Sequence, residues 1–331
     1  MRHPSSFEHD TGGHPENRRR ITAIEEAMSD RDWLGMELVE APAATRAQLE
    51  RVHSAAHVDS IEELSARGGG PIDLDTVASA GSWNAALHAA GGAVRAAERL
   101  VSDGGFAFCG LRPPGHHAER GRAMGFCLFN NVAVASAHAI AELGVERVLV
   151  LDWDVHHGNG TEAIFYGSPQ VLYASIHQSP LYPGTGAATD SGSGQGEGFT
   201  VNLPVPPGSG SDEFLSLVQT IVVPIARELR PGLLCISAGY DAHRDDPLAN
   251  CEVDDEGYRD MAATMRDLGA ELGVPVLICL EGGYSLGALS RSVVATLEAF
   301  AGDHEPRAAP PEPAAGFREG LARFWPVLER A

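Results

Sequence analysis

The stretch "LDWDVHHGNGTE", residues 151–162, places three carboxylates and two adjacent histidines directly behind the apolar run "RVLVL". Asp152, Asp154 and His156 are spaced two residues apart, so they would share one face if the extended conformation persists. Buried carboxylates at a strand end are costly without a counter-charge, and a divalent cation supplies one. This stretch therefore favours a metal site.

Two further polar clusters follow apolar runs: "YDAHRDD" (240–246) after "LLCISAG", and "EGGY" (281–284) after "VLICL". Three Asp or His ligands with an open fourth position are typical of a catalytic Zn²⁺ site. Asp154, His156 and Asp241 fit that pattern. The alternative is that Asp154 and Asp241 cap the helices that follow them, since Asp is a favoured N-cap. The convergence of several strand ends favours the metal site.

A histidine pair, His116 and His117, stands in "RPPGHHA" (112–118). Consecutive residues cannot both face one ligand from a regular strand or helix, but a turn with rigid prolines and a permissive glycine brings both imidazoles into one cavity. One could deprotonate a water molecule at the metal while the other protonates the leaving group. Tyr284 could donate a hydrogen bond to a developing oxyanion. Taken singly, these residues also fit plain packing roles.

The elements that must position these residues are apolar, β-prone runs alternating with helical patterns. We predict strands at 105–109, 147–152, 170–176, 199–205, 232–239 and 275–283. We predict helices near 82–101, 128–143, 212–229, 255–272 and 286–302. This alternation indicates a single α/β domain with a central, mostly parallel sheet flanked by helices and a ligand site at the carboxyl ends of the strands.

The predicted catalytic domain spans residues 1–304. The Pro/Ala-rich stretch that follows (305–316) is expected to be a linker to a short helix within 305–331 that packs on the same domain and carries Phe317, Phe324 and Trp325. The Gly-rich segment 182–198 is either a plain connector or the rim of a site.

Composition limits the partners. The formal net charge of −21 argues against nucleic acid as a direct ligand and favours cationic partners. The five cysteines have no CxxC spacing and are expected to be reduced core residues. No apolar run reaches membrane-spanning length and the first residues lack a secretory signal, so we expect no membrane association and a cytoplasmic location. A homo-oligomer is left open.

Six ordered motifs together resemble the zinc-dependent histone deacetylase family, above all its bacterial deacetylase-like amidohydrolases and class II enzymes. The resemblance runs from "HDTGGHPENRRR" (9–20) to about residue 300 and implies the arginase-like α/β fold. The motifs are "RPPGHHA" (112–118), "GFCLFNN" (125–131), "LDWDVHHGNGT" (151–161), "YPGTG" (182–186), "AGYDAHRDDPL" (238–248) and "LEGGY" (280–284).

The resemblance implies that Asp154, His156 and Asp241 hold one Zn²⁺, although the same set accepts Fe²⁺. It makes His116 and His117 the tandem catalytic pair, with Asp152 orienting the first. Asn159 stands where some relatives have an Asp behind the second. An Asn accepts a hydrogen bond without carrying charge, so His117 should hold a proton less readily than with an Asp partner. Tyr284 matches the residue that polarises the scissile carbonyl.

The resemblance also implies a substrate tunnel and a second cation. Phe126 and Tyr182 match the aromatic pair of the tunnel, Gly125 lies at its floor, and Leu248 stands where a polyamine-selective relative has a Glu gate. A structural K⁺ would be bound by Asp152, Ser175, Ile176 and the backbones of Asp154 and His156. His157 is expected to be structural.

The function implied is hydrolysis of acetyl-lysine-type amides, on proteins or peptides, to acetate and a free amine. An acetylpolyamine or other small acylamide amidohydrolase is the first alternative, which the acidic charge favours and the short segment between His57 and Trp83 disfavours. A binuclear arginase-like hydrolase, with a second metal near Asp241, His243 and Asp245, is another. An inactive acyl-lysine binder is the last.

Overall fold

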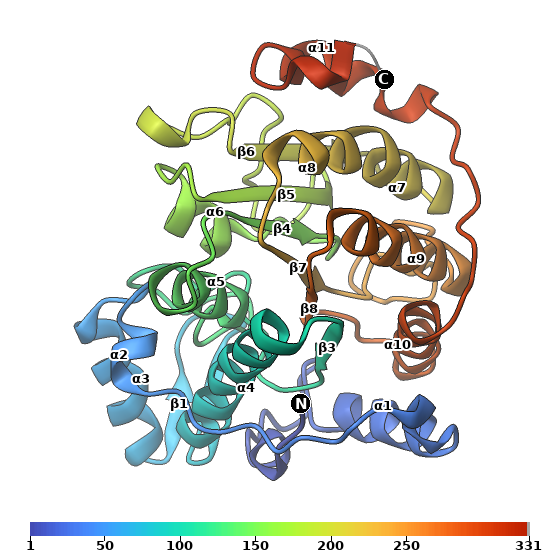
Figure 1. Ribbon diagram of the computed structural model, residues 1–331. Coiled ribbons are helices and arrows are strands. Elements are labelled where there is room, and N and C mark those ends of the chain that lie inside the picture. The colour runs from blue at the N-terminus through green and yellow to red at the C-terminus, as the bar shows by residue number, and fades with distance from the viewer. Residues whose placement is uncertain (330–331) are drawn as a thin grey trace.

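A six-stranded parallel sheet runs through the centre of the protein in the order β3-β8-β7-β4-β5-β6 (Figure 1). The computed structural model describes residues 1–329. The strands are β3 (Phe106–Cys109), β4 (Val148–Asp152), β5 (Val171–Gln178), β6 (Thr200–Val205), β7 (Leu233–Ala238) and β8 (Val276–Leu280). All six predicted strands are present, and the predicted α/β class with a parallel sheet is confirmed.

Each central strand is buried on both faces because alternate side chains enter two separate cores. In β4, Leu149 and Leu151 pack in one core, whereas Val148 and Val150 pack in the other. This two-sided burial explains why the strands read as continuous apolar runs rather than as alternating ones. Asp152 ends β4 and is itself fully buried, so the chain places a carboxylate at the edge of the apolar layer.

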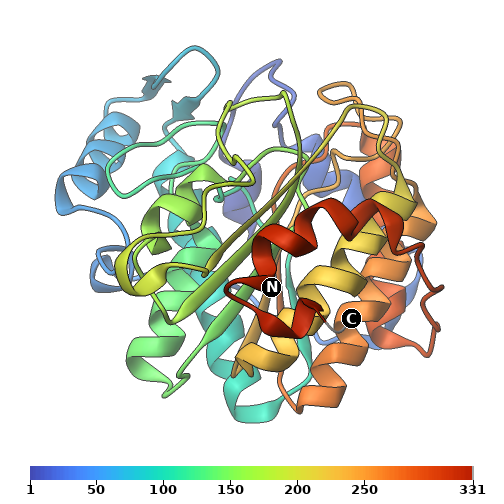
Figure 2. The same ribbon diagram turned by 90° about the horizontal axis from the view of Figure 1, so that it is seen from above.

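Helices cover both faces of the sheet (Figures 1 and 2). One face carries α4 (Ser82–Asp103) and α5 (Asn131–Glu142), and the short α6 (Asn159–Phe165) supplies Phe165 to the same core. The other carries α1 (Arg19–Ser29), α7 (Ser211–Leu217), α8 (Val223–Leu229), α9 (Asp255–Leu272) and α10 (Leu286–Ala301). Two short helices, α2 (Arg46–Leu49) and α3 (Ala55–Ala66), and the hairpin β1 (Gly69–Pro71) and β2 (Val77–Ser79) lie beyond α4.

Two predicted helices differ from those observed. The helix predicted over 212–229 is interrupted by a π-turn at Val218–Val222. Pro224 follows this turn. Because proline has no backbone N–H to donate, the wider turn accommodates the hydrogen bond that the helix lacks at this point. The helix predicted from residue 128 begins at Asn131, because the side chain of Asn130 caps it by accepting the Ala133 N–H.

The last described segment packs along the β6 side of the molecule (Figure 1). Helix α11 (Ala315–Ala322) leads to Trp325, whose indole N–H donates to the Gly198 carbonyl (2.9 Å) and whose ring contacts Phe199. The predicted boundary at residue 304, between the catalytic domain and the C-terminal segment 305–331, stays a prediction. The last two residues of that segment, 330 and 331, lie outside the described range. Within residues 1–329, no helix combines the length and apolarity needed to cross a bilayer.

The strand order creates a crevice at one place. From β4 the chain proceeds outward to β5 and β6, and then returns to add β7 and β8 on the opposite side of β4. In open α/β sheets ligands bind outside the carboxyl ends of the strands at such a reversal. Asp152 ends β4 and Asp241 follows β7, so both candidate carboxylates lie at this crevice.

Candidate active site

Asp154, His156 and Asp241 form a compact, buried group at the crevice. One potential ligand atom from each lies within 4.8 Å of the other two. The Nδ1 atom of His156 is 3.2 Å from Asp154 Oδ1 and 3.1 Å from Asp241 Oδ2. The structure thus brings together the three residues predicted to bind a metal.

Backbone groups hold both carboxylates in place. The Gly282 N–H donates to Asp154 Oδ2 (2.8 Å), and the Val155 N–H donates to Asp241 Oδ1 (3.0 Å). Gly282 is needed here because a Cβ at that position would stand 2.0 Å from the second Asp241 carboxylate oxygen. The first glycine of "EGGY" therefore allows the backbone to approach the two carboxylates closely.

The charge balance of this group fits a divalent cation. Burial lowers the pKa of His156, but its hydrogen bonds with Asp154 and Asp241 outweigh that effect and raise the pKa to about 10. In the protein chain alone, a proton on the imidazole therefore provides the counter-charge between two buried carboxylates. An imidazole with two carboxylates is also a donor set that suits Zn²⁺ or Fe²⁺.

His116 and His117 lie in the turn after β3 with their ring centroids 4.0 Å apart. Both are buried. The preceding Gly115 is required by space rather than by an unusual φ, because a Cβ there would lie 2.5 Å from the Asn131 nitrogen. The predicted turn is thus present, although the reason for its glycine differs from the one expected.

His116 is oriented by Asp152. Its Nδ1 lies 3.0 Å from Asp152 Oδ2, which also accepts the hydroxyl of Tyr173 (2.9 Å). Burial lowers the pKa of His116, but the charges of Asp154 and Asp152 outweigh it and raise the pKa to about 10. The Nε2 atom remains free of Asp152 and lies 3.8 Å from Asp154 Oδ2, so it faces the metal group.

His117 has a neutral partner. Its Nδ1 lies 2.8 Å from the Asn159 Oδ1, and the Asn159 amide donates to Glu119 Oε1 (2.8 Å). Burial, followed by the charge of His116, holds the pKa of His117 well below its ordinary value. This direction agrees with the expectation that His117 holds a proton weakly.

Each aromatic side chain predicted to form a tunnel contacts one candidate catalytic residue. Tyr182 meets the His117 ring edge-on at 5.2 Å between centroids, and Phe126 meets Tyr284 edge-on at 5.7 Å. Gly125 has a φ of 55°. A Cβ at Gly125 would come within 2.4 Å of the His117 ring, so only glycine leaves room for this imidazole.

Leu248 is half-buried and joins the site through its backbone. Its N–H donates to Asp246 Oδ1 (3.0 Å), and Asp246 Oδ2 accepts the Tyr284 N–H (2.6 Å). Asp246 therefore links Leu248 to Tyr284, a role that the sequence did not reveal. The place of Leu248 as a tunnel residue stays a prediction.

Among the residues predicted to bind a monovalent cation, Asp152 ends β4 whereas Ser175 and Ile176 lie within the neighbouring β5. Asp152 is opposite Ser175 in the strand register, and Ser175 and Ile176 are both buried. The Ser175 hydroxyl is 2.9 Å from the His177 Nδ1.

His157 supports the Gly-rich segment 182–198. Its Nδ1 lies 2.8 Å from the Thr185 hydroxyl and its Nε2 lies 3.1 Å from Glu162 Oε2. Because Tyr182 stands beside His117 and His156, this segment forms part of the rim of the site rather than a plain connector.

Two residues of the binuclear alternative, His243 and Asp245, lie 3.7 Å apart but make contacts away from Asp241. His243 Nε2 lies 3.3 Å from Asp255, and Asp245 pairs with Arg291 (3.2 Å). Neither joins Asp241 in a potential metal group among residues 1–329.

A buried ion network beneath the site was missed by sequence reasoning. Arg20 donates to the Gly283 carbonyl (2.7 Å), and its guanidinium carbon lies 5.1 Å from the Tyr284 ring centroid. Glu16 bridges Arg20 (3.1 Å) and Arg112 (2.5 Å), and all three are fully buried. The available signal was charged residues within "GGHPENRRR" and "RPPG", yet nothing local in either motif shows that they meet.

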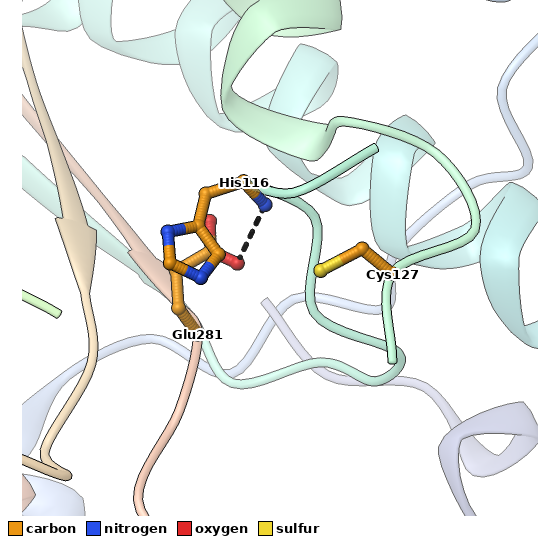
Figure 3. Close-up of side chains that lie close together, drawn as sticks. All are labelled: His116, Cys127 and Glu281. Atoms are coloured by element: carbon orange, nitrogen blue, oxygen red, sulfur yellow. Dashed lines mark hydrogen bonds between the residues drawn. The ribbon is translucent and has the colours of Figure 1, made fainter. Parts of the chain in front are cut away.

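Glu281 was also missed (Figure 3). Its Oε2 accepts the backbone N–H groups of Gly115 (2.6 Å) and His116 (3.1 Å), and its Oε1 accepts the Ser237 hydroxyl (3.2 Å). Burial, partly offset by the charge of His116, raises the Glu281 pKa to about 7. Through these hydrogen bonds, the Glu281 carboxylate connects the turn that carries His116 and His117 to the end of β8.

Comparison with known proteins agrees with this geometry. Residues 14–300 match the histone deacetylase domain. A probable deacetylase of Methanothermobacter thermautotrophicus is 45% identical over 93% of this chain and 92% of its own length. A histone deacetylase-like amidohydrolase of Pseudomonas aeruginosa is 39% identical over 87% and 76%, respectively. The crystal structure of the HDA15 HD domain superposes with a TM-score of 0.90 at 37% identity, covering 98% of this chain and 95% of that one.

Proposed function

Because this chain belongs to the histone deacetylase family, we propose that it is a zinc-dependent deacetylase that hydrolyses acetyl-lysine-type amides to a free amine and acetate. One observation carries the proposal. The buried group of Asp154, His156 and Asp241 lies beside two histidines that each have one ring nitrogen held and the other free.

Asp154, His156 and Asp241 would hold the Zn²⁺, and Fe²⁺ suits the same atoms. Such an ion polarises an amide carbonyl and makes a water molecule more acidic. A structural K⁺ is part of the proposal, held by Asp152, Ser175, Ile176 and the backbones of Asp154 and His156. It is supported by the buried position of Asp152 opposite Ser175.

The histidines would move protons. Asp152 fixes Nδ1 of His116 and Asn159 fixes Nδ1 of His117, so Nε2 of each ring is left to exchange a proton with the attacking water or the leaving amine. Their environments push the two pKa values in opposite directions, which is the usual mark of a divided acid and base role.

Tyr284 would stabilise the oxyanion. Burial raises the pKa of its hydroxyl well above the ordinary value, so the group keeps its proton and can donate a hydrogen bond. Arg20 and Asp246 both contact this residue, the first over the ring and the second at the backbone N–H. Tyr284 is therefore placed before substrate arrives.

The substrate class follows from the rim. Phe126 and Tyr182 offer two aromatic walls to an aliphatic side chain. The turn between β1 and β2 carries Asp73 and Asp75 and reaches this rim, since the Phe126 N–H donates to the Thr76 hydroxyl (3.1 Å). Carboxylates at the mouth favour cationic substrates, as the net charge of −21 does. This supports peptides rich in lysine and admits acetylpolyamines.

The test combines metal analysis with turnover of an acetyl-lysine peptide and N-acetylputrescine. We expect about one Zn²⁺ per chain and preferred turnover of the peptide. The variant Tyr284→Phe should lose about 10²- to 10³-fold in kcat with little change in KM, because one oxyanion donor is removed.

Preference for N-acetylputrescine would move the substrate to polyamines. Metal content without turnover of either amide, in protein that retains its thermal unfolding transition, would contradict the proposed activity. We also propose a cytoplasmic location, supported by five buried, unpaired cysteines, which are typical of a reducing compartment.

A further inference from the structure

A second group of potential metal ligands includes the first histidine of the pair (Figure 3). It comprises His116, Cys127 and Glu281, and one ligand atom from each lies within 4.8 Å of the other two. All three residues are buried. They come from three parts of the chain: the turn after β3, the bend that follows Gly125 and Phe126, and the end of β8.

We propose that His116, Cys127 and Glu281 form a second, thiolate-containing site for a divalent transition metal, and that occupation of this site inhibits the enzyme. An imidazole, a thiolate and a carboxylate together suit Zn²⁺ and its neighbours such as Co²⁺, whereas Mg²⁺ and Ca²⁺ prefer oxygen ligands alone. Shared tetrahedral ligation would require the three atoms to draw closer, so the Cys127 side chain would have to turn toward the Glu281 carboxylate, which three hydrogen bonds hold in place.

The surroundings of Glu281 support a cation at this place. Its carboxylate accepts two backbone N–H groups and the Ser237 hydroxyl, and it forms no ion pair with an Arg side chain among residues 1–329. The charge of His116 offsets only part of the cost of burying this carboxylate. A divalent ion would supply the remaining positive charge and would displace the proton of the Cys127 thiol.

The thiol of Cys127 is available for this role. In the structure it donates to the Gly125 carbonyl (3.2 Å) and lies against the His117 backbone. Burial, followed by the charge of Glu281, raises the pKa of this thiol well above its ordinary value, so it would lose its proton only to a bound cation. Gly125 also lies against the His117 ring, so the thiol is close to the histidine pair.

Inhibition is expected because only one ring nitrogen of His116 is available to a metal ion. Asp152 holds Nδ1 of His116, so a metal in this group would take Nε2, the atom that the proposed mechanism uses for proton transfer. This consequence rests on the proposed function, whereas the binding of metal does not. Nε2 lies 3.8 Å from Asp154 Oδ2, so the two sites are adjacent.

The experiment is a Co²⁺ titration of the metal-depleted full-length protein, followed by absorption and turnover. The first equivalent, bound by Asp154, His156 and Asp241, should give turnover and no thiolate-to-cobalt charge-transfer band. Further Co²⁺ should produce that near-ultraviolet band and lower turnover by about tenfold or more. The band must appear together with the loss of turnover.

Three variants decide the assignment. Cys127→Ala should show no band and less than about a twofold loss of turnover with excess Co²⁺, relative to its own activity at the first equivalent. Glu281→Gln should require at least about tenfold more Co²⁺ to develop the band. Cys251→Ala, which removes another buried thiol, should behave like the unaltered protein.

A band that never develops, or one that persists in Cys127→Ala, would overturn the second site. If Cys127→Ala does not fold, Cys127→Ser and the titration of the unaltered protein still decide. A Cys127-dependent band in protein without any turnover would leave the site standing and would instead contradict the proposed function.

Discussion

The Nδ1 atom of His117 lies 2.8 Å from the side-chain oxygen of Asn159, and the amide nitrogen of the same Asn159 donates to Glu119 Oε1 at 2.8 Å. The Glu119 carboxylate thereby fixes which end of the amide faces the imidazole, because a carboxylate accepts only from the nitrogen. Asn159 is thus a neutral hydrogen-bond acceptor for His117, and Glu119 sets its orientation.

Replacing Asn159 with Asp should raise the pKa of His117, because a carboxylate stabilises the imidazolium form. We expect the ionisation of His117 to move upward by about one unit. The introduced carboxylate and Glu119 would repel each other, so the double variant Asn159→Asp with Glu119→Gln should show the larger shift. The pH profile of kcat/KM measures it, with Glu119→Gln alone as the control. Identical profiles for all variants would show that Asn159 does not set the protonation of His117.

Replacing Glu16 with Gln should destabilise the protein by about 3–5 kcal/mol, since two buried guanidinium groups, of Arg20 and Arg112, lose their shared carboxylate. Urea unfolding measures the loss. Glu63→Gln, which breaks the exposed pair with Arg67, is the matched control and should cost less than about 1 kcal/mol. Equal effects of the two substitutions would contradict the importance we give to the buried network.

The sheet and the metal group could be predicted from the sequence for a shared physical reason. Strands buried on both faces must be continuously apolar, so runs such as "VLVL" stand out, and parallel strands end at the same edge. Asp154, His156 and Asp241 follow two such runs and therefore converge. The family resemblance added roles that spacing alone could not assign, such as those of Tyr182 and Asn159.

Other features could not be predicted because they depend on tertiary contacts. Arg20 reaches the carbonyl of Gly283 across 263 residues, and no local periodicity marks either end. Glu281 reads as the polar end of a strand, yet its function is to hold the backbone of His116. The break before Pro224 was overlooked because the apolar pattern continues through it, and only the missing N–H reveals the wider turn.

Stability should fall as the pH drops below about 6.5, partly because of His53. Burial, and then the charge of His57, lower the pKa of His53 to about 3. The unfolded chain binds this proton near pH 6.5 and the folded chain only near pH 3, so the unfolded state is favoured progressively between those values.

Near pH 5, His53→Gln should reduce the difference in bound protons between the unfolded and folded states by about one. The pH slope of the free energy of unfolding should therefore fall by about 1.4 kcal/mol per pH unit. Urea unfolding of the metal-free protein at pH 7 and pH 5 measures it. His14, an N-terminal histidine that is only half-buried, provides the control variant His14→Gln. The same pH slope in His53→Gln and in the unaltered protein would contradict the assignment.

Trp325 should stabilise the protein without taking part in turnover. Its indole donates to the Gly198 carbonyl and packs against Phe199, where the Gly-rich segment 182–198 meets β6. Trp325→Ala should cost about 3 kcal/mol in urea unfolding. Phe317→Ala, at a half-buried position of α11, should cost less. Turnover at 25 °C should persist, because His157 holds Thr185 and His177 holds Gly186 nearer to Tyr182. A raised KM in Trp325→Ala, with folding intact, would show instead that the C-terminal segment positions the rim of the tunnel.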